Sequence, residues 1–514
     1  MQTQLADPGF IAPIAAQAAE LGQWLRQTLA PGATLRGDSR LVEPGDAFFA
    51  VPGLRADGRA FIGQAIARGA RAVVYEQGEP LAVASGLAMR PVQGLRELAG
   101  QIASEFHGRP SEALDVVAVT GTNGKTSTTQ WIARGLQAIG RNPAVIGTLG
   151  CGPLGALQPF DYTTPDALQT QALLAGLVAN KVDVLAMEAS SIGLDQGRVN
   201  GTRIRVAAFT NLTRDHLDYH GSMQDYALAK AALFHWPGLQ AVVVNGDDEY
   251  SLRMLAAASS QDPTPTRIVY GFAPSQFGAR GDAVLTAEGL REGEGGSQFF
   301  LGGDFGRAQV RLKLLGAFNV SNALAVAGCW LALGIGFDQV AQALEGLEPV
   351  PGRLQFIEHP AAPLAVIDYA HTPDALASVL GALRPVAEAR GGALWCVFGA
   401  GGDRDAGKRP MMGMVAERHA DRLVITSDNP RGESPFRIVS DLRAGLTREP
   451  ELTELDRRAA IGAALQRAAA SDVVLIAGKG HERHQEIAGV RHAFSDLQVA
   501  QECLAARASE AADV

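Results

Sequence analysis

The sequence predicts an α/β protein of three domains, with open, mostly parallel sheets in the second and third. Its 514 residues correspond to roughly three domains at about 150 residues each. Short β-branched runs alternate with helical patterns after residue 115, an alternation typical of strand–helix–strand units. Polar joins rich in Gly and Pro near residues 110 and 350 divide the chain into segments 1–110, 111–349 and 350–514.

Composition excludes several classes of protein. Hydrophobic residues make up 47% of the chain and charged residues 19%, as in an ordinary soluble globular protein. The 45 Lys and Arg residues against 54 Asp and Glu give a formal net charge of −9, which argues against a general binder of nucleic acids or anionic membranes. The four cysteines lie far apart and the N-terminus lacks the pattern of a secretory signal. We therefore expect free thiols and a cytoplasmic protein.

Segment 1–110 carries two strand patterns with a helical pattern between them. The apolar runs AFFAV (47–51) and RAVVY (71–75) have the length of buried strands, and the helical stretch begins at Phe61. The segment ends at the polar join FHGRPSE.

Segment 111–349 begins with the clearest series of parallel strands. The runs that predict them are 115–120, 182–188, 205–211 and 241–247. Residues 273–310 are richer in Gly and polar side chains, which favours a smaller antiparallel insertion. No residue from 314 to 337 is charged, a length that could span a membrane. Polar residues at one end and many Gly and Ala residues favour a buried core helix instead.

Segment 350–514 repeats the alternation as a Rossmann-like sheet. Its predicted strands are 364–370, 393–401, 422–428 and 472–480, and each ends in a cluster of Gly and charged or polar residues. In open α/β sheets, ligands bind beyond the carboxyl ends of the strands. We therefore expect a binding site where these clusters meet.

The stretch VVAVTGTNGKTSTTQW (116–131) predicts a phosphate-binding loop. A strand pattern ends at Thr120 and a helical pattern follows the small residues, so backbone N–H groups and the helix dipole can meet phosphate oxygens. Lys125 would reach the terminal phosphates and the Thr126 hydroxyl would ligate Mg²⁺. Val119 stands where the strict pattern has glycine, but the strand–loop–helix context still predicts nucleotide binding. The expected contacts are Gly121, Thr122, Asn123, Gly124, Lys125, Thr126 and Ser127.

Seven further motifs follow this loop in order. They are MEASSIGLDQGRV (187–199), NLTRDHLDYHG (211–221), NVSNALA (319–325), DYAHTPDAL (368–376), GGDRDAGKRP (401–410), DNPR (428–431) and GKGHE (478–482). With DSRLVEPGDAFFAVPG (38–53), the set resembles the Mur ligase family over nearly the whole chain. The resemblance implies a first domain for the UDP end of the substrate, a central ATP-binding domain and a third domain for an incoming amino acid.

The resemblance also implies a reaction. ATP would phosphorylate the glutamyl carboxylate of UDP-N-acetylmuramoyl-L-alanyl-D-glutamate, and an amine would displace the phosphate to form an amide. The protein would be a monomeric, cytoplasmic enzyme of peptidoglycan precursor synthesis whose partners are small molecules.

Four side chains carry the catalytic part of the resemblance. Lys125 would bind the phosphates, and Glu188, at a strand end, would share Mg²⁺ with Thr126. His216 would hold a second Mg²⁺. Lys230 would be carbamylated by CO₂ and so become an anionic metal ligand. From the residues alone, Glu188 could instead pair with a neighbouring cation, His216 could be solvated and Lys230 could be a surface lysine.

Further residues are assigned by the same resemblance. Asn319, which could equally be a helix N-cap, would lie at the adenine, and Arg353 and Asp368 would complete the nucleotide site when the domains come together. The expected contacts to the UDP substrate are Ser39, Thr163, Thr164, Ser190, Gln196 and Arg198. Ile192 stands where the family usually has His, and Tyr162 where Asn is also common, so the finer substrate contacts differ from the usual pattern.

The DNPR motif identifies the expected amine as meso-diaminopimelate. Diaminopimelate has one more carboxylate than lysine, and a buried Arg431 would grip it with two parallel hydrogen bonds. With lysine bound, Arg431 would lose partners worth about 1.5–3 kcal/mol each. The full expected set is Arg404, Asp428, Asn429, Pro430, Arg431, Gly478 and Glu482.

Two other classes compete with this interpretation. A folylpolyglutamate-synthetase-like ligase has a similar phosphate loop, but DSRLVEPGD in a separate first domain argues against it. A nucleotide switch or transport ATPase has no use for GGDRD, DNPR and GKGHE at successive strand ends. A homologue without activity is disfavoured because Lys125, Glu188, His216 and Lys230 are all present.

Overall fold

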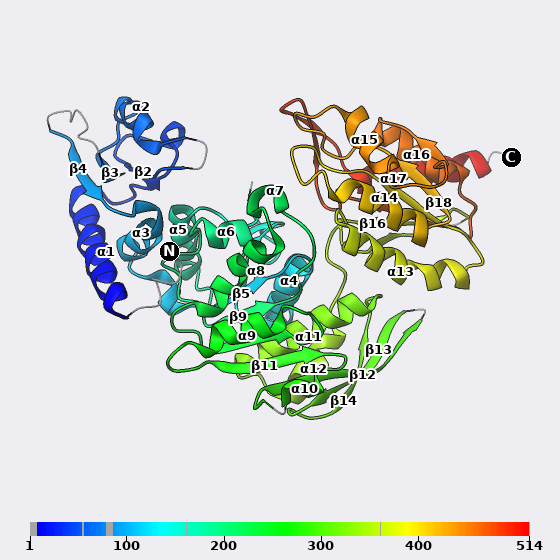
Figure 1. Ribbon diagram of the computed structural model, residues 1–514, viewed down its shortest axis with the longest axis horizontal. Coiled ribbons are helices and arrows are strands. Elements are labelled where there is room, and N and C mark those ends of the chain that lie inside the picture. Colours follow the sequence, from blue (N-terminus) through cyan, green and yellow to red (C-terminus); the bar gives the residue numbers. More distant parts are fainter. Residues whose placement is uncertain are drawn as a thin grey trace.

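A computed structural model describes residues 8–53, 56–78, 86–160, 162–278, 280–293, 295–359 and 361–512. Its strands form three principal sheets, and the fold is the expected three-domain α/β arrangement. Figure 1 shows the first domain in blue and the third in yellow to red on either side of the central domain. The boundaries at 110 and 350 remain predictions.

The first domain is a small parallel sheet covered by helices. Its strands pair in the order β1-β2-β3-β4. They are β1 (Leu35–Arg36), β2 (Ala47–Ala50), β3 (Ala72–Glu76) and β4 (Ala88–Val92), and the helices are α1 (Pro8–Thr28), α2 (Ile62–Ala67) and α3 (Leu95–Phe106). Both predicted strands are therefore present, and the regular helix begins at Ile62, one residue after the expected position.

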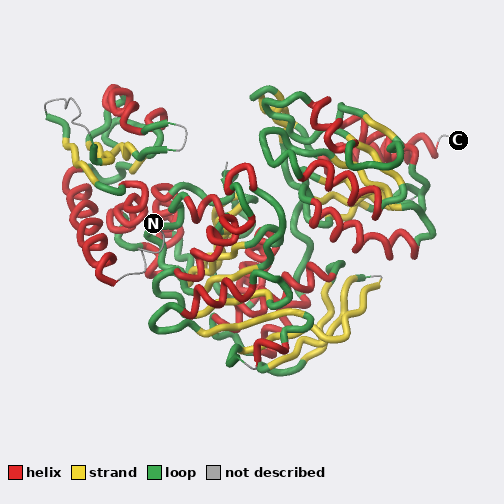
Figure 2. Tube along the Cα trace, viewed as in Figure 1, coloured by secondary structure: helices red, strands yellow, loops and turns green. Residues whose placement is uncertain are grey.

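The central domain is a ten-stranded sheet within the described residues, ordered β14-β13-β12-β11-β10-β9-β5-β8-β6-β7. The predicted parallel strands form its middle. The strands are β5 (Asp115–Thr120), β6 (Pro143–Gly147), β7 (Gly150–Pro153), β8 (Val184–Glu188), β9 (Val206–Phe209), β10 (Ala241–Asn245), β11 (Thr266–Gly271), β12 (Ala283–Gly293), β13 (Gly296–Gly303) and β14 (Ala308–Leu312). The antiparallel strands expected in 273–310 are β12 to β14, which extend this sheet at the lower right of Figure 2.

Helices on both faces of the central sheet bury its core. They are α4 (Lys125–Ala138), α5 (Ala167–Ala179), α6 (Ser191–Asp195), α7 (Leu217–His220), α8 (Met223–Ala231), α9 (Ser251–Ser259), α10 (Ser275–Gly278), α11 (Ala317–Ala332) and α12 (Phe337–Glu345). The uncharged stretch forms α11, which packs against α4. A Cβ on Gly135 would lie 1.9 Å from the Trp330 ring, so only glycine permits this contact. No helix within the described part of the chain is long and apolar enough to cross a membrane.

The third domain is a parallel sheet with one antiparallel edge strand. Its order is β15-β16-β20-β17-β18-β19. The strands are β15 (Gln355–Ile357), β16 (Leu364–Asp368), β17 (Leu394–Phe398), β18 (Arg422–Ile425), β19 (Leu452–Thr453) and β20 (Val473–Ala477), with the hairpin β21 (His484–Ile487) and β22 (Val490–Ala493). The helices are α13 (Pro373–Ala389), α14 (Lys408–His419), α15 (Pro435–Arg443), α16 (Arg457–Arg467) and α17 (Asp496–Ala512).

The four cysteines are free thiols, as expected. Cys151, Cys329 and Cys396 are buried, and Cys503 is partly exposed.

Candidate functional site

The phosphate loop lies between β5 and α4 and depends on two glycines. Gly121 and Gly124 both have positive φ, a conformation that side chains rarely adopt. A Cβ on Gly121 would meet Thr210 Oγ1 at 1.8 Å, and one on Gly124 would meet Asn322 Oδ1 at 2.3 Å. The Lys125 ammonium donates to the carbonyl oxygens of Gly121 and Thr122, both at 2.9 Å. The loop thus presents the N-terminus of α4 toward the carboxyl end of the central sheet.

Glu188 lies beside this loop at the end of β8. It is 1% exposed, and its two oxygens accept hydrogen bonds from the backbone N–H and the hydroxyl of Thr148. A Cβ on Gly147 would lie 2.4 Å from Glu188 Oε1, so the backbone forms a close cradle for the carboxylate. Glu188 attracts the Lys125 ammonium, and this attraction opposes the burial that lowers the pKa of Lys125.

Lys230 is buried, in contrast to the default expectation of a surface lysine. Its ammonium donates to Gly121 O at 2.7 Å and lies 4.5 Å from the centre of the Tyr226 ring. Burial, and next the positive charge of Lys125, hold the pKa of Lys230 well below its usual range. Burial of an amine among other positive charges disfavours its protonated form.

His216 completes this group of side chains. Burial is the main cause that lowers the pKa of His216, to about 4, with Lys125 and Lys230 acting in the same direction against the attraction of Asp215. The imidazole is therefore neutral at pH 7, and neutral imidazole is the form that binds metals.

The oxygen donors of Thr126 and Glu188 fit a hard cation such as Mg²⁺. No group of three or more His, Cys, Asp or Glu residues able to hold a metal was found within the described ranges. A metal here would consequently need further oxygen ligands from a bound nucleotide and water.

Arg353 reaches the phosphate loop from the third domain. One of its Nη atoms donates to Thr126 Oγ1 at 3.2 Å, and its guanidinium stacks on the Tyr369 ring at 4.4 Å. The carboxylate of Asp368 accepts the N–H groups of Leu354 and Ala370, both at 2.7 Å. Asp368 therefore fixes the turn that carries Arg353.

Asn319 is not the N-cap of α11, the alternative that its sequence position allowed. Gly316 occupies the cap, and Asn319 lies three residues inside the helix. Its side chain donates to Leu315 O at 2.8 Å and is largely buried.

A network between the domains centres on Asp215, which sequence reasoning missed. Lys408 Nζ lies 3.0 Å from Asp215 Oδ1, while His216 and His371 approach Oδ2 at 3.6 Å each. Burial would raise the pKa of Asp215, but the three partners together hold it well below the usual range. A second pair joins Arg214 to Asp405 at 3.0 Å. The Lys408–Asp215 and Arg214–Asp405 pairs join residues about 190 positions apart in the sequence, so no local sequence pattern predicts them.

The residues expected to contact the UDP substrate lie on two adjoining loops and in the first domain. Thr164 Oγ1 donates to Glu188 O at 2.8 Å and lies 3.1 Å from Ser190 Oγ. Arg198 donates to Thr164 O at 2.9 Å and also to Gln196 Oε1.

The remaining members are Thr163, Ser39 and the unusual Tyr162. Thr163 Oγ1 lies 3.2 Å from the Thr148 hydroxyl, and the buried Ser39 donates to Gln64 at 2.7 Å. The Tyr162 ring lies 4.9 Å from the Arg198 guanidinium and is 57% exposed.

The DNPR and GKGHE motifs lie together beyond β18 and β20. Asn429 Nδ2 donates to Glu482 Oε2 at 2.8 Å. A Cβ on Gly478, which has φ +117°, would lie 2.4 Å from an Asp428 carboxylate oxygen. Lys479 is fully buried between Asn429 and Glu482. Sequence reasoning passed over this lysine because a single Lys inside GKGHE is surface-like by default.

Arg431 is less buried than expected. Its side chain is 24% exposed, one Nη donates to Gly402 O at 2.8 Å, and Nε lies 3.7 Å from Glu486. Arg404 is exposed. A Cβ on Gly401 would lie 2.8 Å from Arg431 Nη1 and 3.8 Å from Arg404 Cγ, so both arginines border this glycine.

Below this site, a fully buried ion pair ties the strand ends together. Arg457 and Asp496 form two hydrogen bonds of 2.7 Å, and both side chains are 0% exposed. The Arg457 guanidinium also donates to Ser427 O and Ala477 O. Arg457 therefore holds together the residues that directly precede the DNPR and GKGHE motifs.

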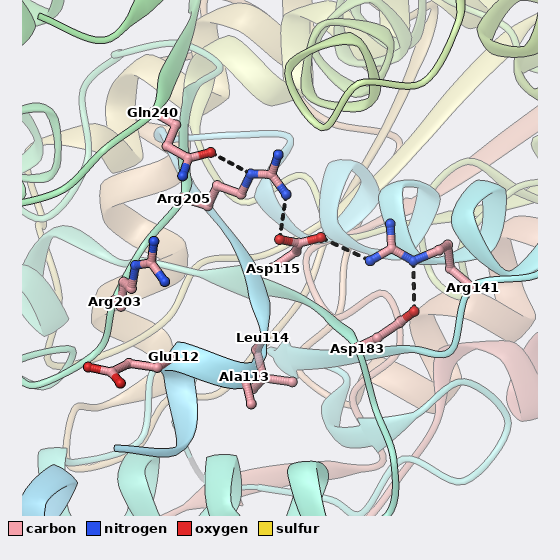
Figure 3. Close-up of a pocket in the computed structure, with 9 residues that line it drawn as sticks. All are labelled: Glu112, Ala113, Leu114, Asp115, Arg141, Asp183, Arg203, Arg205 and Gln240. Atoms are coloured by element: carbon pink, nitrogen blue, oxygen red, sulfur yellow. Dashed lines mark hydrogen bonds and ion pairs between the residues drawn. The ribbon is translucent and has the colours of Figure 1, made fainter.

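A pocket of about 470 Å³ lies at the opposite end of the central sheet. Figure 3 shows Asp115 held between Arg205 and Arg141, with Arg141 also paired to Asp183. Ligands of open α/β sheets bind at the carboxyl ends of the strands, and the charged side chains of this pocket already neutralise one another. We therefore interpret these ion pairs as structural contacts and not as a ligand-binding site.

Comparison with known proteins gives matches along nearly the whole chain. Residues 34–107 match the Mur ligase family catalytic domain, 119–330 the Mur ligase middle domain and 352–480 the Mur ligase glutamate ligase domain.

Two relatives that align with the chain over almost their whole length carry the same name. The chain is 48% identical over 504 residues to the UDP-N-acetylmuramoyl-L-alanyl-D-glutamate–2,6-diaminopimelate ligase of Ralstonia nicotianae, covering 96% of this chain and 98% of the relative. The ligase of that name from Pseudomonas aeruginosa is 48% identical over 471 residues, covering 91% and 94%. A solved structure of such a ligase has a TM-score of 0.65 and 37% identity, covering 92% of this chain and 95% of that one.

Proposed function

The chain belongs to the Mur ligase family, and from this premise we infer that it joins 2,6-diaminopimelate to UDP-N-acetylmuramoyl-L-alanyl-D-glutamate at the expense of ATP. It is thus an ATP-dependent ligase of peptidoglycan precursor synthesis. The observation that carries this conclusion is the contact of Arg353 from the third domain with Thr126 of the phosphate loop. Through that contact, the domain that carries the phosphate loop and the domain that carries DNPR face a common site.

ATP would bind along the phosphate loop. The backbone from Gly121 to Ser127 and the N-terminus of α4 provide N–H groups for phosphate oxygens. Lys125 would exchange its two bonds to loop carbonyls for a phosphate oxygen. Arg353 would add a second positive charge, and charge neutralisation is the main catalytic requirement of phosphoryl transfer. Asn319 would lie beside the adenine of the nucleotide, and Asp368 would lie at the junction between the second and third domains.

Mg²⁺ would be held by Thr126 and Glu188, and a second ion by His216 and a carbamylated Lys230. Bound there, the cations would neutralise phosphate charge. The support for carbamylation is the buried position of the Lys230 amine and its lowered pKa, because CO₂ reacts with a neutral amine. Carbamylation would also remove one of two neighbouring positive charges. Electron density at the Lys230 amine in a crystal grown with bicarbonate tests this assignment.

The glutamyl carboxylate would enter between the central loops, where Thr163, Thr164, Ser190, Gln196 and Arg198 provide hydroxyls, an amide and a guanidinium. Ser39 would serve the UDP end from the first domain.

Diaminopimelate would bind beyond β18 and β20. Arg431 and Arg404 provide cations for one carboxylate, and Asn429, Gly478 and Glu482 the polar groups for its other end, with Asp428 and Pro430 shaping the loop. We propose the meso isomer as substrate. The amine would then attack the activated carboxyl group and release phosphate.

A phosphate-release assay tests the proposal. Purified protein with ATP and the UDP-dipeptide should release phosphate with meso-diaminopimelate and much less with L-lysine. Equal or faster turnover with lysine would contradict the assigned amine. ATP hydrolysis that does not depend on the UDP-dipeptide would favour an ATPase instead. A monomer in size-exclusion chromatography and a cytoplasmic location remain predictions of the same proposal.

A further inference from the structure

The lysine of GKGHE is a buried cation with two polar partners. Lys479 is 0% exposed, and its Nζ donates to Asn429 Oδ1 at 2.9 Å and to Glu482 Oε2 at 2.7 Å. Burying an ammonium is costly unless it is paired and hydrogen-bonded. Lys479 therefore constrains both partners, one from each of the two motifs at this site.

The bonds of Lys479 fix the orientation of the Asn429 amide. Asn429 Oδ1 accepts from both Lys479 and the backbone N–H of Glu486, the latter at 3.0 Å. With its oxygen committed to two donors, the amide must turn its NH₂ group toward Glu482, where Nδ2 donates at 2.8 Å.

Glu482 is left with one occupied and one available oxygen. Its Oε2 accepts from both Lys479 and Asn429, whereas Oε1 has no hydrogen-bond partner among the described residues. The side chain is 21% exposed. Since an ammonium group is only a donor, an oriented carboxylate oxygen at the edge of the site is what an amino group of a substrate requires.

We propose that Lys479 is a positioning residue for the amino-acid substrate, holding Asn429 and Glu482 so that Glu482 Oε1 accepts an ammonium group of diaminopimelate. This inference rests on the proposed function, which assigns Asn429 and Glu482 to diaminopimelate. Lys479 acts through these residues and not by contact, because its ammonium is fully enclosed.

Steady-state kinetics of the full chain test the role. Loss of an ordered charged hydrogen bond corresponds to about ten- to a hundredfold in affinity, so Lys479→Met should raise the KM for meso-diaminopimelate about tenfold or more. The KM values for ATP and the UDP-dipeptide should stay within about twofold of wild type. Lys313→Met, which removes an exposed lysine, is the matched control and should change none of the three values.

A double variant separates positioning from a general structural effect. If Lys479 acts through Glu482, Lys479→Met combined with Glu482→Gln should have the same KM for diaminopimelate as Glu482→Gln alone. Lys479→Gln removes the charge but keeps a donor in the buried space, so it should show a smaller rise in the same KM alone; this variant also covers the case in which the methionine variant is unfolded.

Three results would overturn the inference: an unchanged KM for diaminopimelate in both Lys479 variants, a parallel rise of all three KM values, or multiplied effects in the double variant. Failure of the wild-type protein to use diaminopimelate at all would instead contradict the proposed function, so the two outcomes are distinguishable.

Discussion

Replacing Asp496 by asparagine should loosen the strands that carry the amino-acid site. Asp496 and Arg457 are both 0% exposed and share two hydrogen bonds of 2.7 Å. Removing one partner of a buried pair costs about 3–5 kcal/mol, because the other charge stays buried without compensation. The guanidinium would keep its bonds to Ser427 O and Ala477 O, but it would lose the negative charge and one of the two acceptor oxygens opposite it.

Hydrogen exchange measures this loss locally, which matters in a protein of three domains. The amides of β20 (Val473–Ala477) should exchange about a hundredfold faster or more in Asp496→Asn, since about 1.4 kcal/mol corresponds to a factor of ten. The control is Glu502→Gln, which removes an exposed partner of Arg458 on the same two helices. It should leave β20 exchange unchanged. Equal exchange in both variants would refute the reasoning.

Three further predictions concern other parts of the molecule. Gly124→Ala should abolish binding of an ATP analogue, because its Cβ would lie 2.3 Å from Asn322 Oδ1 at a positive φ; an unchanged Kd by titration calorimetry would contradict this. Tyr162→Asn should raise the KM for the UDP-dipeptide about two- to fivefold by removing a cation–π contact, whereas Tyr162→Phe should not, and equal values for both variants would exclude the contact. Asp115→Asn should lower the Tm at pH 7. Burial raises the pKa of Asp115, but Arg141 and Arg205 outweigh it and hold the pKa below its usual range. This stabilisation is present above the unfolded pKa of about 3.9 and is lost as pH falls through the folded value, so a Tm difference that persists at pH 2 would be inconsistent with it.

The fold, and the place of the candidate phosphate loop within it, could be predicted from the sequence. Buried strand patterns are local, so the sequence alone indicates β5, β8 and the loop of small residues after Thr120. The position of Glu188 beside Lys125 follows from the parallel pairing of those strands.

Contacts between distant loops could not be predicted in this way. His371 and Lys408 belong to the third domain, so they reach Asp215 only when the second and third domains are adjacent. Burial was misjudged for the same reason: Lys230 and Lys479 have the local sequence of exposed lysines, and only tertiary packing encloses them. The resemblance to a family identified Lys230, but nothing in the sequence identified Lys479.

The salt links between Arg214 and Asp405 and between Asp215 and Lys408 bear on how the enzyme could be re-engineered. Each pair has one member on either side of the domain junction, so a transplanted third domain brings only half of the set. A chimera intended to accept a different amino acid should therefore keep an acidic residue at position 405 and a lysine at position 408 of the transplanted domain. Without them, we expect the transplanted domain to lose both salt links to the nucleotide-binding domain.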